Sequence, residues 1–235
     1  MIFNILNPEY RYSKLTEITP EWVLKSGYTA LLVDIDNTLL ARNCNIISET
    51  HIRWLTAFRR QGIPLALTSN NGGRRTAAIR KQLEQNGLDI QIFSWAGKPF
   101  PRAFSGAIRL LEGPNIAKQA SPWKTTINPV QYKDSATDPV QIQNNTAELQ
   151  EKGTKSPVTG GKDNHTAVIL AIGDQLFTDV LGAHLYGLPA AWVRPLSKND
   201  FIGTKLLRIL ESLVAGYLQQ NGMLPEEDIE SRDKT

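Results

Sequence analysis

A chain of 235 residues with 26 lysines and arginines against 23 aspartates and glutamates has a formal net charge of only +3. This charge does not indicate a nucleic-acid partner, and the single cysteine, Cys44, excludes an intramolecular disulfide and a cysteine-based zinc site. No apolar run approaches the roughly 18 residues of a membrane span, and the N-terminus lacks signal-peptide features. We expect a cytoplasmic protein that can touch the inner face of a membrane peripherally.

The first part of the chain predicts one short helix, one strand and one longer helix. Thr19 is placed as the N-cap of the short helix, because a proline follows it at the first helical position. The apolar run at 30–35 predicts a buried strand. Ser48 is expected to cap the next helix, which Gly62 closes.

Two further strand–helix pairs follow, with strands at 63–68 and 90–95 and helices at 74–85 and 100–111. Residues 113–165 differ, because they hold five prolines, many polar residues and little apolar periodicity. We interpret this segment as a disordered insertion, with a functional lid as the alternative.

The last part of the chain predicts a strand at 166–172, a helix at 176–185, a strand at 190–193 and an amphipathic helix at 202–217. Strands that alternate with helices predict an α/β fold, here a three-layer α/β/α arrangement with a doubly wound, mostly parallel sheet. The expected domain organisation is one domain formed by 1–112 and 166–220, the insertion at 113–165, and a flexible tail at 221–235.

Two carboxylates, Asp34 and Asp36, stand at the end of the first predicted strand. If the chain turns after Asp34, the pair can bracket a phosphate at the edge of the sheet where such sites lie. Asp34 is then a candidate nucleophile that forms an aspartyl-phosphate, and Asp36 is a candidate general acid for the leaving oxygen. The alternative is a strand followed by an ordinary Asp/Asn-rich turn.

Later strand ends carry groups that suit the same chemistry. Ser69 can donate a hydrogen bond to a phosphoryl oxygen, and Lys98 supplies a fixed positive charge. Asp174 is a hard ligand for Mg²⁺, and Asp179 can hold a metal-bound water or orient Lys98. Taken alone, each group is more often explained by a structural role: Ser69 as a helix cap, Lys98 as a solvated loop charge and Asp174 as a turn residue. Together and in order at strand ends, they favour a phosphoryl-transfer site.

Four segments resemble, in order, the motifs of the haloacid dehalogenase superfamily: Asp-Ile-Asp-Asn-Thr, Thr-Ser-Asn-Asn, Lys98-Pro99 and Gly-Asp-Gln-Leu-Phe-Thr-Asp. Residues 6–112 and 166–215 are similar, more closely, to the YqeG-like branch of capless, subclass IIIA phosphatases. An Ile-Thr-Pro-Glu lead-in and the run Gly-Asp-Gln-x-x-Thr-Asp-Val-Leu-Gly carry this likeness. The segment at 113–165 departs from the compact pattern of that branch.

The resemblance implies a Mg²⁺-dependent phosphatase whose catalytic residues are Asp34, Asp36, Ser69 and Lys98. It implies substrate contacts from Thr38, Asn70 and Asn71. It implies metal binding by Asp34, Asp36, Asp174 and Asp179. The branch includes phosphatases of phosphatidylglycerophosphate, so a membrane lipid headgroup is the expected substrate. A protein or soluble phosphomonoester is the alternative, as is a non-catalytic binding protein on the same fold.

The spacing of the motifs also bears on the substrate. Only 30 residues separate Thr38 from Ser69 and 28 separate Ser69 from Lys98, so neither gap can hold a folded cap domain. An uncapped site admits large or surface-bound substrates.

Two basic or apolar features lie outside the motifs. Arg74, Arg75, Arg80 and Lys81 are candidates for contact with an anionic surface, with a solvated helix face as the alternative. The last helix carries an apolar stripe that we expect to pack on the sheet rather than to enter a bilayer. This stripe consists of Ile202, Leu206, Ile209 and Leu213.

Overall fold

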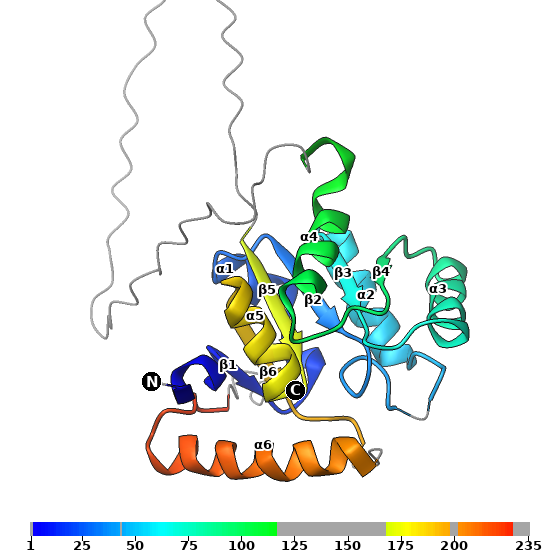
Figure 1. Ribbon diagram of the computed structural model, residues 1–235. Helices are drawn as coiled ribbons and strands as arrows, with labels where there is room; N and C mark the ends of the chain where they lie inside the picture. Colours follow the sequence, from blue (N-terminus) through cyan, green and yellow to red (C-terminus); the bar gives the residue numbers. More distant parts are fainter. Residues whose placement is uncertain (1, 43, 117–167, 198–201, 228–235) are drawn as a thin grey trace, which may run out of the picture. The chain divides into compact units, whose positions relative to one another are not determined.

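The computed structural model describes residues 2–42, 44–116, 168–197 and 202–227 (Figure 1). From residue 117 onward, the predicted insertion lies outside these ranges. The helix before it continues to Ile116, past the expected boundary at residue 112.

Six strands form one sheet in the order β1-β6-β5-β2-β3-β4, and every neighbouring pair is parallel. The strands are β1 (Tyr10–Tyr12), β2 (Ala30–Asp34), β3 (Leu65–Thr68), β4 (Gln91–Phe93), β5 (Ile169–Gly173) and β6 (Ala190–Val193). The helices are α1 (Pro20–Lys25), α2 (Glu49–Arg60), α3 (Arg74–Gln85), α4 (Pro101–Ile116), α5 (Leu181–Tyr186) and α6 (Ile202–Gln220). Shorter turns are the 3₁₀ helices η1 (Ile2–Leu6) and η2 (Leu15–Glu17) and the π-helix η3 (Leu176–Val180).

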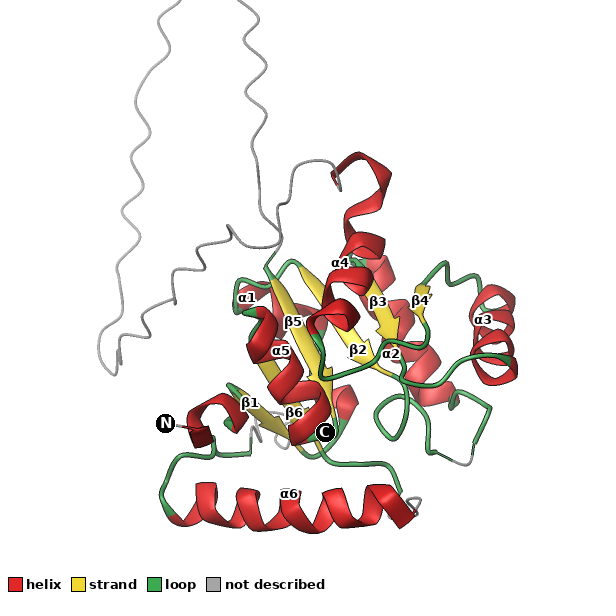
Figure 2. Ribbon diagram, viewed as in Figure 1, coloured by secondary structure: helices red, strands yellow, loops and turns green. Residues whose placement is uncertain are grey.

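Helices cover both faces of this sheet, so the predicted three-layer α/β/α class is confirmed (Figure 2). Alternate residues of β2 point to opposite faces. Leu31 and Val33 pack with residues of α1, α2 and α3, whereas Ala30 and Leu32 pack with residues of α4, η3 and α5. All five residues of β2 are buried, which is typical of a central strand in a parallel sheet.

The predicted helix caps are confirmed. Thr19 Oγ1 accepts a hydrogen bond from Trp22 N at 3.2 Å, and Ser48 Oγ accepts one from His51 N at 3.2 Å. The predicted helix at 176–185 is instead one turn of π-helix followed by α5. The edge strand β1 was not predicted, because three residues are too few to show a strand pattern.

The chain order of the strands reverses between β2 and β5. From β2 the chain moves outward through β3 and β4, then returns to the other side of β2 with β5 and β6. In doubly wound sheets, ligands bind at the carboxyl ends of the strands that flank such a reversal. Asp34 ends β2 and Asp174 directly follows β5, so both lie at this point.

The expected packing of the last helix is wrong for the two stripe residues whose side chains are described. Ile209 and Leu213, which were expected to pack on the sheet, are 57 % and 65 % exposed. The side chains of Ile202 and Leu206 lie outside the described residues. Beyond α6, Glu227 forms a bridge with Arg11 of β1, so the predicted tail is attached to the sheet up to this residue. None of the helices in the described ranges has the length and apolar character to cross a bilayer.

Candidate active site

Three buried carboxylates meet at the carboxyl edge of the sheet. They belong to Asp34 at the end of β2, Asp174 after β5 and Asp179 within η3. One oxygen of each lies within 4.8 Å of the others. Carboxylate oxygens are the ligands that Mg²⁺ prefers, so this acidic cluster can hold a metal ion.

Lys98 reaches the same cluster from the loop after β4. Its Nζ donates to Asp34 Oδ1 and, at 2.6 Å, to Asp179 Oδ1. Burial lowers the pKa of Lys98, but the charges of Asp179 and Asp34 outweigh this effect and raise it above its ordinary value. Lys98 is therefore a fixed positive charge beside Asp34.

The acidic cluster carries more negative charge than Lys98 neutralises. Burial, with the charges of Asp179 and Asp174, raises the pKa of Asp34 well above its ordinary value despite the opposing effect of Lys98. A bound cation would favour the ionised form of Asp34, which is the form required for nucleophilic attack.

The position of Asp179 depends on the backbone of the strand end that precedes it. Gln175 N donates to Asp179 Oδ2 at 3.1 Å. A Cβ atom on Gly173 would lie 2.3 Å from Asp179 Cγ, so only glycine fits at the end of β5. The glycine at position 173 is thus explained by the close approach of the Asp179 carboxylate.

Asp36 lies in a second polar group beside the acidic cluster. Its Oδ2 accepts hydrogen bonds from Ser69 Oγ at 2.6 Å and Asn71 Nδ2 at 2.9 Å. Its Oδ1 lies 3.1 Å from Arg75 Nη2. Among the described residues, the carboxylate of Asp36 does not belong to the group that can hold a metal ion, which differs from its expected role as a metal ligand.

The three residues expected to contact substrate make hydrogen bonds within the site. Thr38 Oγ1 donates to Asp174 Oδ1 at 3.2 Å. The side chain of Asn70 bonds both backbone groups of Lys98, with Nδ2 to O at 3.2 Å and Oδ1 from N at 2.8 Å. Asn71 holds Asp36, as described above. In this arrangement, these side chains position the acidic and basic groups.

Sequence reasoning missed the role of Arg75 and that of two residues near the acidic cluster. Trp192 Nε1 donates to Asp174 O at 3.0 Å, so an indole on β6 anchors a cluster residue. Asn37 has a φ of 68°, a left-handed conformation that turns the chain between Asp36 and Thr38. Leu196 N donates to Asn37 O at 2.8 Å. An asparagine directly after Asp36 could have predicted this turn, because asparagine tolerates the left-handed conformation. Nothing in the sequence around Trp192 indicated its bond to Asp174.

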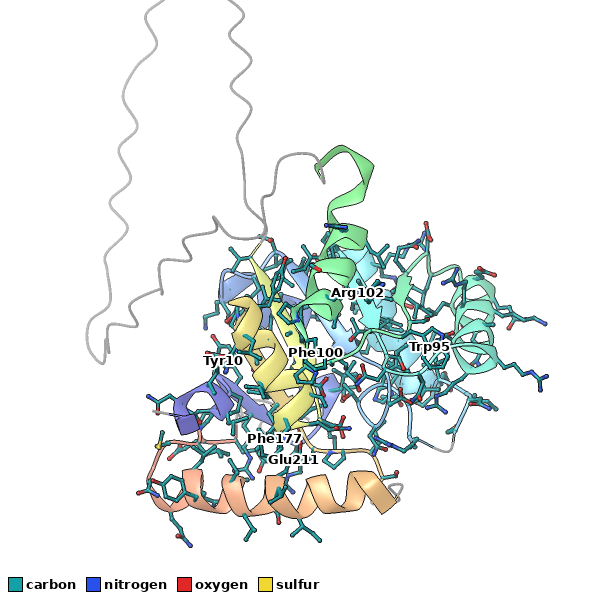
Figure 3. All side chains as sticks on the ribbon, viewed as in Figure 1. Tyr10, Trp95, Phe100, Arg102, Phe177 and Glu211 are labelled. Carbon is teal, nitrogen blue, oxygen red and sulfur yellow. The ribbon has the colours of Figure 1, made fainter. Side chains whose placement is uncertain are left out.

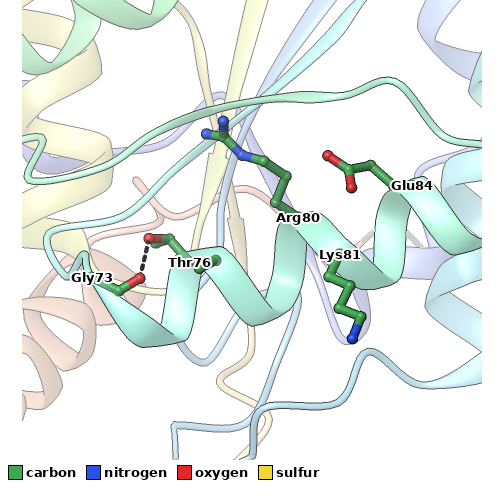
Figure 4. Close-up of a pocket in the computed structure, with 6 residues that line it drawn as sticks. Gly73, Thr76, Arg80, Lys81 and Glu84 are labelled. Carbon is green, nitrogen blue, oxygen red and sulfur yellow. Dashed lines mark hydrogen bonds between the residues drawn. The ribbon is translucent and has the colours of Figure 1, made fainter.

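The other basic residues of α3 lie apart from these groups. A shallow pocket of about 260 Å³ runs along the exposed side of α3 and is lined by Gly73, Thr76, Ala77, Arg80, Lys81 and Glu84 (Figure 4). None of these residues belongs to the acidic cluster or to the group around Asp36. Arg74 is also exposed. The alternative of a solvated helix face therefore describes these basic residues, with Arg75 as the exception.

Comparison with known proteins gives one informative likeness. The chain is similar to "Probable phosphatase YqeG" of Bacillus subtilis (strain 168), with 23 % identity over 228 residues. The alignment covers 97 % of this chain and 100 % of the relative. No family model and no solved structure matches the chain.

Proposed function

We propose that this protein is a phosphatase that hydrolyses phosphomonoesters through an aspartyl-phosphate on Asp34. The observation that carries the proposal is the buried cluster of Asp34, Asp174 and Asp179 with Lys98 bonded to two of its members. The end-to-end likeness to a probable phosphatase supports the same activity. A binding protein would not need a buried nucleophile, a fixed cation and a separate acid in one place.

The residues of the chain suit two successive displacements at phosphorus. Asp34 attacks phosphorus, the bond to the leaving oxygen breaks, and Asp36 gives that oxygen its proton. Asp36 then takes a proton from a water molecule that attacks the aspartyl-phosphate, and this step releases phosphate and regenerates Asp34. Lys98 and Ser69 can stabilise the charge on the phosphoryl oxygens during both steps.

The donor set of the acidic cluster fits Mg²⁺, which we propose as the cofactor. Asp34, Asp174 and Asp179 offer hard oxygen ligands, and their excess negative charge favours a divalent cation. When bound there, Mg²⁺ would supply positive charge beside the phosphoryl oxygens. Asp179 also bonds Lys98, so it can orient this lysine as well as offer an oxygen to the cation.

We propose phosphatidylglycerophosphate as the substrate. Among the described residues, the elements between Asp36 and Ser69 are α2 and β3, and those between Ser69 and Lys98 are α3 and β4. These segments form no cap domain, which supports access for a phosphate presented at a membrane surface. The likeness to the YqeG-like branch supports the choice of this lipid. A protein or soluble phosphomonoester is the competing substrate.

The test has two stages with purified protein. Release of phosphate from an aryl phosphate is measured with Mg²⁺ and with a chelator, and activity that requires the cation supports the metal-dependent phosphatase. Vesicles that contain phosphatidylglycerophosphate are then compared with glycerol 3-phosphate, a nucleotide and a phosphopeptide at equal phosphate. Equal rates on the soluble compounds would refute the lipid substrate while leaving the phosphatase in place. If none of the compounds is hydrolysed, the proposed phosphatase activity is refuted.

A further inference from the structure

The helix α6 presents four large apolar side chains to the outside. Ile209, Leu210, Leu213 and Tyr217 are 57 %, 47 %, 65 % and 44 % exposed, and we call these four residues the α6 outer face. A surface helix of a globular protein normally buries such residues and exposes its charges. The outer face is therefore a surface that needs a partner.

The inward side of the same helix includes its only carboxylate. Glu211 is 4 % exposed and its Oε1 accepts a hydrogen bond from Phe177 N at 3.2 Å. Leu218 is fully buried, and Val214 and Ala215 pack against the core on this side. Because Glu211 holds the inward side against η3, the outer face cannot turn inward without breaking the hydrogen bond between the buried Glu211 side chain and Phe177 N.

The contact between α6 and η3 places the helix beside the acidic cluster. Phe177 precedes Asp179 by two residues within η3. Figure 1 shows α6 running past the carboxyl ends of β5 and β6, and Figure 3 shows Glu211 and Phe177 where the two elements meet. A surface that binds the outer face would therefore lie at the same edge of the sheet as Asp34 and Asp174.

Other exposed apolar side chains gather at this edge. Of the 11 large hydrophobic residues that are exposed in the described ranges, eight belong to α6 or to loops after β2, β4 and β6. The four in loops are Ile46, Trp95, Phe100 and Leu196. Trp95 and Phe100 flank Lys98 in sequence and are 73 % and 70 % exposed. The loop that carries Lys98 thus adds two exposed aromatic side chains at the same edge of the sheet.

The charge of α6 distinguishes between possible partners. Its three charged residues, by sequence, are Lys205, Arg208 and Glu211. Since Glu211 is buried, the helix offers no exposed acidic group that could pair with the basic residues of a second copy. An anionic bilayer matches both properties, because interfacial helices insert an apolar face and attract lipid headgroups with lysine and arginine.

We propose that the α6 outer face docks the protein on the surface of an anionic bilayer. One consequence rests on the proposed function: docking would bring the phosphate of a membrane lipid to Asp34. The docking itself depends on the exposure of the four apolar residues and on the charge of the helix.

Flotation with vesicles tests the docking on the full-length protein. The vesicles contain phosphatidylcholine alone or with about 30 % phosphatidylserine, an anionic lipid without a phosphomonoester. We expect the wild type to float with the anionic vesicles. The double variant Ile209→Ser/Leu213→Ser should lose on the order of tenfold in its partition coefficient between water and vesicles, because two apolar side chains that would contact lipid are removed. The matched control Leu24→Ser/Leu185→Ser, at residues 50 % and 52 % exposed on α1 and α5, should float like the wild type.

Three results would overturn the docking. The first is that the wild-type protein does not bind anionic vesicles. The second is that the Ile209→Ser/Leu213→Ser variant floats as well as the wild type and has the same melting temperature. The third is that the wild type is a dimer and the variant is a monomer. The last would show that a second copy covers the outer face. Hydrolysis of an aryl phosphate is measured on the same wild-type preparation. Vesicle binding without hydrolysis would leave the docking in place and refute only the proposed phosphatase.

Discussion

Arg75 Nη2 lies 3.1 Å from Asp36 Oδ1, and the pair joins the first turn of α3 to the chain segment after β2. The other terminal nitrogen, Nη1, donates to Arg42 O and Cys44 O, each at 2.8 Å. Ser69 and Asn71 bind the opposite oxygen of Asp36. Arg75 is therefore a positioning residue for the proposed general acid, and α3 contributes to the site although none of its residues lies in the motifs.

Replacement of Arg75 by alanine should slow hydrolysis most for substrates with poor leaving groups. These substrates need a proton from a correctly placed Asp36, whereas an aryl phosphate needs it less. We expect a loss of about tenfold to a hundredfold on an alkyl phosphate and a smaller loss on an aryl phosphate. The measurement is kcat/KM for a series of leaving groups.

The neighbouring Arg74 provides the control. Arg74 is exposed on the same turn of α3, so Arg74→Ala removes an equal charge without touching Asp36. It should leave the leaving-group dependence unchanged. Equal losses on all leaving groups in Arg75→Ala would show that Arg75 supports the fold rather than the acid.

Local patterns explain how much of this fold was predictable. The strand at Ala190–Val193 has its predicted bounds, and Thr19 and Ser48 cap the predicted helices. Buried strands and helix caps are predictable because they depend on a few residues that are adjacent in the sequence. The grouping of Asp34, Lys98 and Asp174 was also predictable, since each lies at or after the end of a predicted strand and parallel strands end at one edge of a sheet.

Long-range packing explains what was not predictable. Arg75 was one of several basic residues on α3, and its bonds to the backbone carbonyls of Arg42 and Cys44, far from it in sequence, hold it beside Asp36. The stripe of α6 was expected to face the sheet because periodicity shows that a helix has an apolar side. Periodicity does not show which side the rest of the chain covers, and here the buried contact of Glu211 decides it.

A divalent cation should raise the stability of the folded protein, because the acidic cluster binds it only when the chain is folded. At a Mg²⁺ concentration about 100-fold above its dissociation constant, the expected gain is about 2.7 kcal/mol. Thermal unfolding with Mg²⁺ and with a chelator measures it. Asp174→Asn should lose most of this gain, since it removes a ligand charge. An undiminished gain in that variant would place the cation elsewhere.

Asp34→Asn should abolish turnover while preserving the fold. Asparagine has nearly the shape of aspartate but cannot form the acyl phosphate, so activity should fall by at least about a hundredfold on every substrate, aryl phosphates included. Asp36→Asn should retain more activity on aryl phosphates than on alkyl phosphates. Turnover by Asp34→Asn near the wild-type rate would exclude this residue as the nucleophile. Circular dichroism checks that both variants remain folded.

His184 links the N-terminal segment to α5 and should make stability depend on pH. Its Nδ1 bonds Ile5 O at 2.7 Å and its Nε2 bonds Glu9 Oε2 at 3.0 Å. Burial lowers the pKa of His184, but the hydrogen bond and charge of Glu9 outweigh it and raise the pKa above its ordinary value. Burial raises the pKa of Glu9, yet the contact with His184 and the bond from Ala190 N lower it overall.

The signs of these shifts define the pH range in which the pair stabilises the protein. A raised histidine pKa contributes stability that is complete below about pH 6.5 and is lost as the pH rises through the folded value. A lowered glutamate pKa contributes stability that is present above about pH 4.5 and is lost on acidification. The pair should therefore contribute most between these limits, by less than about 1 kcal/mol because Glu9 is partly exposed.

Urea unfolding of the wild type and of His184→Gln at pH 5.5 and 8.5 measures this contribution. We expect the free energy of unfolding of the wild type to exceed that of His184→Gln by more at pH 5.5 than at pH 8.5, since only the charged imidazole forms an ion pair with Glu9. His51→Gln is the contrasting variant, because burial lowers the pKa of His51 and its contribution should grow as the pH rises. If the loss of stability in both variants changed with pH in the same direction, a general charge effect rather than the Glu9–His184 pair would explain the pH dependence.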